Sequence, residues 1–158
     1  MPLEPGDQAP DFTLHAQNGE AFTLSASLRE RGAWHLIYFY PKADTPGCTK
    51  QSCGLRDVRD RIGDTVVVGI SPDPVPRQAR FDQKYGLGFP LLADEDHAVA
   101  DLYGVWGTKS MYGRKYQGIV RSAFLVGSEG SVAEAWYKVS PADTPTNLLA
   151  ALKARQVT

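Results

Sequence analysis

The chain has 158 residues, of which 42% are hydrophobic, and a formal net charge of −1. This length and composition favour a single folded domain over residues 1–158 and argue against disorder. The balanced charge and the lack of a long apolar run give no reason to expect a nucleic-acid or membrane partner. The amino-terminal residues lack the basic start and apolar segment of a secretory signal, so a cytoplasmic protein is expected.

Alternating and helical patterns of apolar residues predict eleven elements. In chain order these are strands over 11–15 and 20–24, a strand over 33–40, a helix over 48–62, a strand over 65–71, a helix over 76–85, a strand over 89–93, a helix over 96–103, strands over 119–126 and 131–139, and a helix over about 143–155. The segment 33–40 is apolar on both alternating faces, which is typical of a central strand covered on both sides. The segment 107–118 is glycine-rich and basic, and is expected to be a surface loop.

Strands that alternate with helices predict an α/β protein with helices flanking a central sheet. The first two strands flank Asn18-Gly19 and predict an N-terminal β-hairpin. The closing strand–turn–strand–helix order implies that the sheet is mixed. Asp143 or Thr144 is expected to cap the last helix, with Pro145 in its first turn.

Both cysteines of the chain, Cys48 and Cys53, follow the central strand and a proline-broken loop. On the predicted helix, Cys48 shares one face with Leu55 and Ile62 and therefore points inward at the amino-terminal end. Unpaired N–H groups and the helix dipole at this end favour a thiolate. An ordinary thiol is only ~3% ionised at pH 7, and making it mostly thiolate takes about 2.7 kcal/mol.

The helix dipole supplies about 1 kcal/mol, and at most about 2 kcal/mol. A further cation is therefore needed beside Cys48. Arg121 is the best candidate, because it is the one charged residue in the segment 119–126. From the pattern alone, Arg121 is either the cation beside Cys48, or an arginine that faces water on an edge strand or forms a structural ion pair, and these interpretations stay open.

The spacing of the cysteines restricts how they can bond. Five residues along an ideal helix correspond to about 7.5 Å of rise and about 140° of net rotation. Such a pair exceeds the Cα separation of about 7 Å that a disulfide tolerates. A bond between Cys48 and Cys53 therefore requires unwinding of the first turns, and Gly54 weakens the helix there by about 1 kcal/mol.

Other interpretations of the two thiols are weaker. A zinc site normally has four ligands at closer spacing, and no metal or organic cofactor is indicated. A Cys–His hydrolase would use His15, His35 or His97, but His35 is expected to be a hydrogen-bonded core residue and His97 to lie at a solvated helix start. A non-catalytic domain with inert thiols is the remaining alternative.

The residues also resemble a known family. Pro41-x-x-x-Thr45-x-x-Cys48 is similar to the active-site signature of peroxiredoxins. Its continuation from Cys48 to Asp57, with Cys53, resembles the bacterioferritin comigratory protein or PrxQ subgroup. The likeness extends over nearly the whole chain, including the Gly6-Asp7-x-Ala9-Pro10-x-Phe12 opening, Leu92-x-Asp94, the 103–107 segment YGVWG and the segment that contains Arg121.

The resemblance implies a thioredoxin-like fold and a thiol peroxidase that reduces hydrogen peroxide and alkyl hydroperoxides. It implies that Cys48 is the peroxidatic cysteine, that the Thr45 hydroxyl orients the peroxide and that Arg121 lies beside thiolate and substrate. It places Pro41 and Gly47 in the substrate pocket.

The resemblance also implies that Cys53 is the resolving cysteine and that thioredoxin or a similar dithiol recycles the enzyme. Some relatives have another cysteine near the position of Ala100, which this chain lacks. Cys53 is then the only intramolecular resolver, and a monomer is expected.

Overall fold

The computed structural model describes residues 2–155, apart from the side chain of Met111. The strands are β1 Thr13–Ala16, β2 Ala21–Thr23, β3 His35–Phe39, β4 Val66–Ser71, β5 Leu91–Ala93, β6 Trp106–Met111, β7 Arg114–Ile119, β8 Ser122–Val126 and β9 Val132–Trp136. The helices are α1 Leu24–Arg31, α2 Pro46–Asp57, α3 Val75–Tyr85, α4 Ala98–Leu102 and α5 Asp143–Ala154, with a 3₁₀ turn at Arg59–Arg61.

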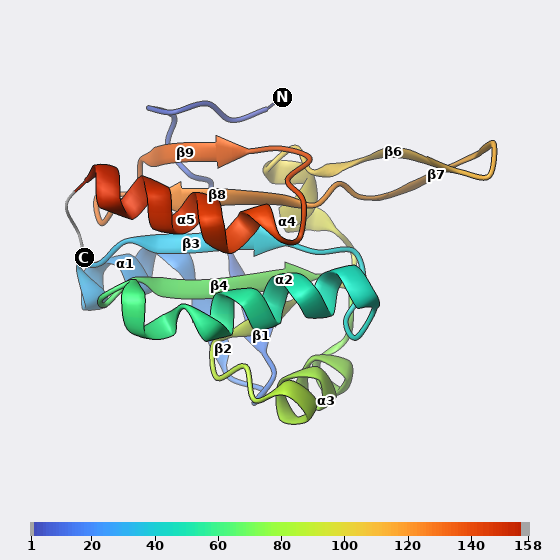
Figure 1. Cartoon of the computed structure of the whole chain (residues 1–158), viewed down its shortest axis with the longest axis horizontal. Coiled ribbons are helices and arrows are strands. Elements are labelled where there is room, and N and C mark those ends of the chain that lie inside the picture. The colour runs from blue at the N-terminus through green and yellow to red at the C-terminus, as the bar shows by residue number, and fades with distance from the viewer. Residues whose placement is uncertain (1, 156–158) are drawn as a thin grey trace.

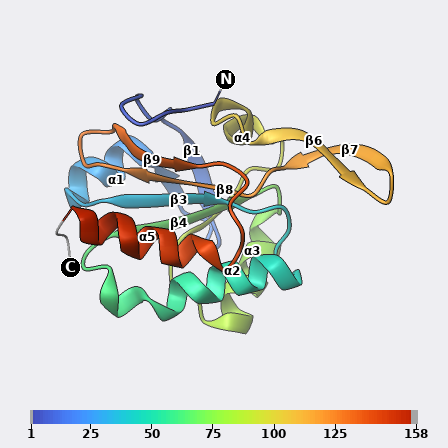
Figure 2. The ribbon, with the colours of Figure 1, turned by 45° about the horizontal axis from the view of Figure 1, so that its top comes forward.

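Seven strands form one sheet in the order β2-β1-β5-β4-β3-β8-β9 (Figure 1). β3 pairs in parallel with β4 and antiparallel with β8, so the sheet is mixed as predicted. The predicted N-terminal hairpin is confirmed by the antiparallel pairing of β1 with β2. Helices α2 and α5 lie side by side over one face, while α1 and α4 lie on the opposite side (Figure 2).

The central strand β3 separates two hydrophobic clusters, because successive side chains of a strand point to opposite faces. Ile37 and Phe39 belong to the cluster packed against α1 and α4. Leu36 and Tyr38 belong to the cluster beneath α2 and α5, which also contains Cys48. All five residues of β3 are buried, which confirms that this strand is covered on both faces.

The expectation of a surface loop over 107–118 was wrong. These residues form a second, two-stranded sheet in which β6 pairs antiparallel with β7 from Trp106–Ile119 to Met111–Arg114. The turn consists of Tyr112 and Gly113, both at positive φ (53° and 78°), which matches the two-residue turns that suit a twisted hairpin. The sequence pattern did not predict these strands, because they contain glycine and lysine, which are both depleted in strands.

The predicted strand over 119–126 is also interrupted. β7 ends at Ile119 and β8 begins at Ser122, so Arg121 lies in the connection between the hairpin and the main sheet. The Val120 N–H donates to the Val105 carbonyl at 2.7 Å, and the Arg121 carbonyl accepts from the Val139 N–H at 2.9 Å. The backbone at this point therefore bonds to loops rather than to a neighbouring strand.

Two helix ends differ from the predictions. α2 starts at Pro46, two residues before Cys48, because proline is well suited to the first turn of a helix. Its α-helical part ends at Asp57, and the predicted length to Ile62 is completed by the 3₁₀ turn. The last helix has Ala142 at its N-cap, with no side-chain capping bond, so neither Asp143 nor Thr144 is the cap. Among the described residues, no helix is long and apolar enough to cross a membrane.

Candidate active site

The loop over residues 41–45 connects β3 to α2 and is fixed at two points. The Ala43 N–H donates to the buried Asp73 carboxylate at 2.7 Å. Asp44, at positive φ (61°), accepts from the Tyr85 hydroxyl at 2.7 Å and pairs with Lys84 at 2.9 Å. These two contacts lower the pKa of the Asp44 carboxyl. The loop is therefore attached to the end of β4 and to α3 before the chain enters α2.

Cys48 lies in the first turn of α2, where Thr45 is the N-cap residue and Pro46 begins the helix. Its side chain is fully buried, as the helical pattern predicted. The first N–H groups of a helix have no carbonyl partner within it, so they point toward the space around the thiol. The Thr45 hydroxyl donates to the Lys42 carbonyl at 2.7 Å, which leaves its oxygen able to accept another hydrogen bond. Pro41 is half-buried at the start of the same loop.

Arg121 comes from the connection between β7 and β8 and meets Cys48. Its Nη1 donates to the Cys48 Sγ at 3.4 Å and to the Gln51 Oε1 at 2.7 Å. Of the interpretations left open by the sequence, this contact favours the one in which Arg121 is the cation beside Cys48. A guanidinium cannot lose its proton in a protein, so it keeps a positive charge beside the sulfur.

Gln51 was not singled out from the sequence. It is fully buried, and its Nε2 donates to the Thr144 Oγ1 at 2.9 Å, while the Thr144 hydroxyl donates to the Ser140 carbonyl at 3.0 Å. A chain of hydrogen bonds thus runs from α5 through α2 to the guanidinium. The sequence did carry one signal for Gln51. It lies three residues after Cys48, on the same helix face, so its polar side chain could be expected to be buried near the thiol.

Gly47 lies against the guanidinium. A Cβ atom at this position would stand 3.0 Å from the Arg121 Nη2 and 3.5 Å from the Pro141 Cγ. A larger residue would require the end of the Arg121 side chain to shift by a few tenths of an ångström. The role of Gly47 in the structure is therefore to allow this close approach.

A second cation belongs to the surroundings of the site. Lys109, on β6, donates from Nζ to the Ile119 carbonyl at 2.8 Å. Partial burial and the positive charge of Arg121 lower the pKa of Lys109, while Cys48 acts in the opposite direction. Lys109 therefore fixes β6 to the end of β7, next to the connection that contains Arg121.

Cys53 lies about two helical turns from the start of α2 and is half-buried. Both cysteines are free thiols, and both lie within the α-helix, which confirms that they cannot bond while α2 is intact. A Cβ on Gly54 would stand 3.1 Å from the Pro145 Cγ, so α2 packs closely on α5 here. Next to Cys53, the Ser52 hydroxyl bonds to the buried Tyr38 hydroxyl at 2.7 Å.

The histidines take no part in this arrangement. His35 is buried and uses both ring nitrogens, with Ser27 at 2.7 Å and the Ala33 carbonyl at 3.0 Å, and its burial lowers its pKa. His97 stacks on Trp106 with ring centroids 3.8 Å apart and bonds to Asp101 at 3.0 Å. His35 is therefore the hydrogen-bonded core residue that was expected, and the Cys–His hydrolase gains no support.

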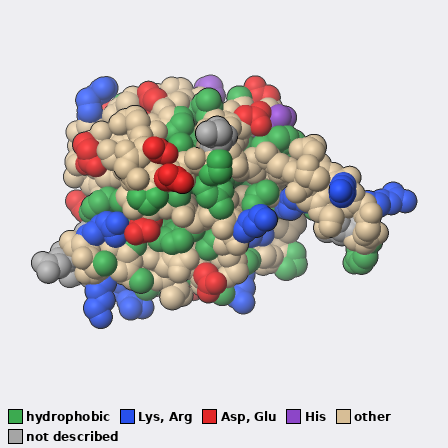
Figure 3. Space-filling model, turned by 90° about the horizontal axis from the view of Figure 1, so that it is seen from above, with side chains coloured by type: hydrophobic (Ala, Val, Ile, Leu, Met, Phe, Trp, Pro, Cys, Tyr) green, Lys and Arg blue, Asp and Glu red, His purple; other side chains and the backbone are tan. Residues whose placement is uncertain are grey.

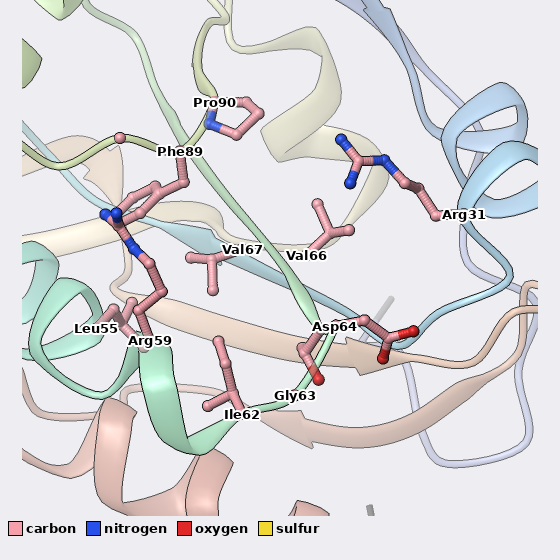
Figure 4. Close-up of a pocket in the computed structure, with 12 residues that line it drawn as sticks. Arg31, Leu55, Arg59, Ile62, Gly63, Asp64, Val66, Val67, Phe89 and Pro90 are labelled. Carbon is pink, nitrogen blue, oxygen red and sulfur yellow. The ribbon is translucent and has the colours of Figure 1, made fainter.

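A pocket of about 290 Å³ lies at the opposite end of α2 (Figure 4). Arg31 and Arg59 approach it from different sides, and Val67 and Phe89 contribute apolar surface. The Arg59 guanidinium donates to the Leu87 carbonyl, which fixes it beside the 88–90 segment that lines the pocket. The pocket is lined by the end of α2 and the start of β4, whereas Cys48 is at the beginning of α2, so the two are separate.

Comparison with known proteins now identifies the family. The model of the AhpC/TSA family matches residues 5–135. The chain belongs to the AhpC/TSA family. Peroxiredoxin Bcp of Escherichia coli (strain K12) is 47% identical over 133 residues, which are 83% of each chain. Peroxiredoxin Bcp of Bacillus subtilis (strain 168) is 39% identical over 155 residues, which are 97% of each chain.

A solved structure of the bacterioferritin comigratory protein of Xanthomonas campestris agrees with the fold at a TM-score of 0.83, with 38% identity over 91% of each chain. A peroxiredoxin of Mycobacterium tuberculosis, BcpB, gives a TM-score of 0.84 at 32% identity over 96% of this chain and 97% of the other. The expected peroxiredoxin family and thioredoxin-like fold are confirmed. The chain is a thiol-dependent peroxidase of this class.

Proposed function

We propose that the chain reduces hydrogen peroxide and alkyl hydroperoxides with Cys48 as the nucleophile. The observation that carries the proposal is the 3.4 Å contact between the Cys48 Sγ and the Arg121 guanidinium in the first turn of α2. The bacterioferritin comigratory protein of Xanthomonas campestris has an alkyl peroxide reduction activity, which supports the same substrate class here.

In the first step, the Cys48 thiolate attacks one peroxide oxygen in line with the O–O bond. An S–O bond forms, and the electron pair of the O–O bond leaves with the other oxygen, which takes a proton to become water or an alcohol. Arg121 and the first-turn N–H groups of α2 stabilise the charge that develops on the leaving oxygen. The Thr45 oxygen accepts the hydrogen bond of the peroxide O–H, while Pro41 and Gly47 shape the pocket.

The product is a sulfenic acid at Cys48, because the sulfur has lost two electrons to the peroxide. After the first turns of α2 unwind, the Cys53 thiolate attacks the Cys48 sulfur, and hydroxide leaves and takes a proton to become water. An external dithiol protein, proposed to be thioredoxin, then returns two electrons to the disulfide. Resolution within one chain needs no second subunit, so we propose a monomer, and a disulfide that is reduced again in every cycle suits the reducing cytoplasm.

Stopped-flow mixing with hydrogen peroxide tests the first step. We expect thiol consumption far faster than that of a free cysteine, and its loss in Cys48→Ser. The matched variant Cys53→Ser should keep the first step and accumulate a sulfenic acid that dimedone traps. Wild-type protein that reacts no faster than a free thiol would refute the proposal.

Mass spectrometry of the oxidised protein tests the second step. We expect a peptide pair joined through Cys48 and Cys53 in a monomeric species. A disulfide formed mainly between two chains would exclude intramolecular resolution while leaving the peroxide reaction intact.

A further inference from the structure

The hairpin β6–β7 projects from the body of the molecule as an arm (Figures 1 and 3). We call residues 106–119 the arm. Its two strands pair with each other and form a sheet separate from the central one. An isolated two-stranded hairpin is only marginally stable in water, so an arm of this kind is not explained by the packing of the core.

The exposed surface of the arm is aromatic and basic. Tyr112 at the tip is 97% exposed and Tyr116 is 41% exposed. The arm contains Lys109, Arg114 and Lys115 and no acidic residue, so it contributes +3 to a chain whose net charge is −1. The remaining residues therefore carry −4 in total, and the positive charge is concentrated on the projecting part.

The residue at the tip, Tyr112, has a backbone conformation that is unusual for a tyrosine. Tyr112 adopts φ of +53°, a conformation that is uncommon for a bulky residue. Asparagine or glycine would fit such a turn without this cost. The chain thus holds a large ring in full contact with water at a strained position, and tyrosine rings combine apolar area with a hydroxyl at many binding surfaces.

The base of the arm leads to Arg121, whose Nη1 donates to the Cys48 Sγ at 3.4 Å. Ile119, the last residue of β7, is buried and is two residues from Arg121. The Lys109 Nζ donates to the Ile119 carbonyl at 2.8 Å, which fixes the base of the arm next to the connection that contains Arg121. A protein bound along the arm would therefore lie beside the segment that contains both cysteines.

We propose that the arm docks the dithiol protein that reduces the Cys48–Cys53 disulfide, through an acidic surface around that protein's reactive dithiol. The inference rests on the proposed function. One thiolate of the partner attacks a sulfur of the disulfide, which forms a mixed disulfide and releases one thiolate of this chain. The partner's second thiolate then attacks the mixed disulfide, so that the partner is oxidised and this chain regains both thiols.

The positive arm favours an acidic partner because complementary charge raises the rate of encounter. A second copy of the chain would present the same arm, and like charges would oppose an arm-to-arm contact. The tyrosines supply the apolar contact that a purely electrostatic encounter lacks.

The test uses thioredoxin as the dithiol protein and two variants of the full chain, Tyr112→Ser and Arg114→Glu/Lys115→Glu. Three readouts are compared: the stopped-flow rate of oxidation by hydrogen peroxide, turnover with dithiothreitol, and turnover over a range of thioredoxin concentrations. We expect the KM for thioredoxin to rise about tenfold in the double variant, with the other two readouts unchanged. Arg29→Glu/Lys153→Glu, at exposed positions of α1 and α5, changes the net charge by the same four units and should behave as wild type.

The dependence on ionic strength provides a second test. The wild-type KM for thioredoxin should rise with salt, and this dependence should be weaker in Arg114→Glu/Lys115→Glu because salt screens charges at the surface. A KM within twofold of wild type in both variants would overturn the proposal. So would a slowed peroxide step with unchanged thioredoxin KM, since the arm would then belong to the peroxide pocket.

Failure of the proposed function gives a different result. Wild-type protein that turns over with dithiothreitol but not with thioredoxin would overturn docking of that protein and leave the peroxidase intact. Wild-type protein that consumes no peroxide with either reductant would overturn the proposed function itself. A wild-type dimer in sedimentation that Tyr112→Ser dissociates would assign the arm to a second copy and overturn the docking proposal.

Discussion

Replacing Gln51 by glutamate changes the charge beside the reactive sulfur with almost no change in shape. Gln51 accepts from the Arg121 Nη1 at 2.7 Å, and the same nitrogen is 3.4 Å from the Cys48 Sγ. A carboxylate oxygen placed at the Gln51 Oε1 therefore lies within about 6 Å of the sulfur. With an effective dielectric constant of about 20, two negative charges at about 6 Å repel each other by about 2.8 kcal/mol.

This repulsion acts on the thiolate but not on the neutral thiol. Since about 1.4 kcal/mol corresponds to a factor of ten, this repulsion lowers the ratio of thiolate to thiol about a hundredfold. The thiolate fraction of a mostly ionised thiol falls less than this ratio, so we expect Gln51→Glu to slow the reaction with hydrogen peroxide by about 25-fold at pH 7. The rate should recover as the pH rises, because the thiolate then forms despite the nearby carboxylate. Stopped-flow measurements from pH 5 to pH 10 give both the rate and its pH dependence.

Two controls separate charge from structural damage. Gln51→Met keeps the volume of the side chain without a new charge, and we expect a much smaller loss of rate. Gln83→Glu adds the same charge on the exposed side of α3 and should leave the rate unchanged. A Gln51→Glu protein that folds normally and reacts within twofold of wild type would show that a negative charge at this position does not act on the Cys48 sulfur, and would refute the reasoning.

Three further predictions follow from the packing around the cysteines. Gly47→Ala places a Cβ 3.0 Å from the Arg121 Nη2, so we expect at least a tenfold slower peroxide step; an unchanged rate would show that the guanidinium moves freely. Asp44→Asn should reduce the free energy of unfolding at pH 7, because the Asp44 carboxyl has a lowered pKa in the folded state. This stabilisation is present above the unfolded pKa and is lost as the pH falls through the folded one, so urea unfolding of the two proteins should converge below about pH 4. Tyr38→Phe leaves the Ser52 hydroxyl unpaired beside Cys53, and should cost about 1–3 kcal/mol in urea unfolding and speed disulfide formation; a slower second phase would contradict this.

The sequence was sufficient for much of the fold. Apolar residues on both alternating faces of the segment 33–40 predicted the central strand, and all five residues of β3 are buried because neighbouring strands and helices surround it. Gly86 at positive φ ends α3 where the pattern placed the stop. The segment 107–118 could not be recognised as a hairpin, since its strands bury little apolar surface and periodic burial is the signal that a sequence carries.

The candidate site was recognised in part. The position of Cys48 at the start of a helix, and its inability to reach Cys53, depend only on local helix geometry and were available from the spacing of the residues. Arg121 could be nominated as the cation beside Cys48 because its neighbours carry no charge, but the pattern could not decide between this role and an arginine that faces water or forms a structural ion pair. The amide of Gln51 and the hydroxyl of Thr144 are 93 residues apart in the chain, and no local pattern relates them.

The sequence by itself determined the chemistry of the 41–57 segment: a proline-broken loop, a thiol in the first turn of a helix and a second thiol on another face of that helix. These features arise from interactions between residues that are close in the chain. Only the tertiary structure decided which cation meets the sulfur, how the Gln51 amide orients it and why Gly47 must be small. Those contacts form when β8, α2 and α5 pack together, and the packing of distant segments depends on the whole core rather than on any one stretch of residues.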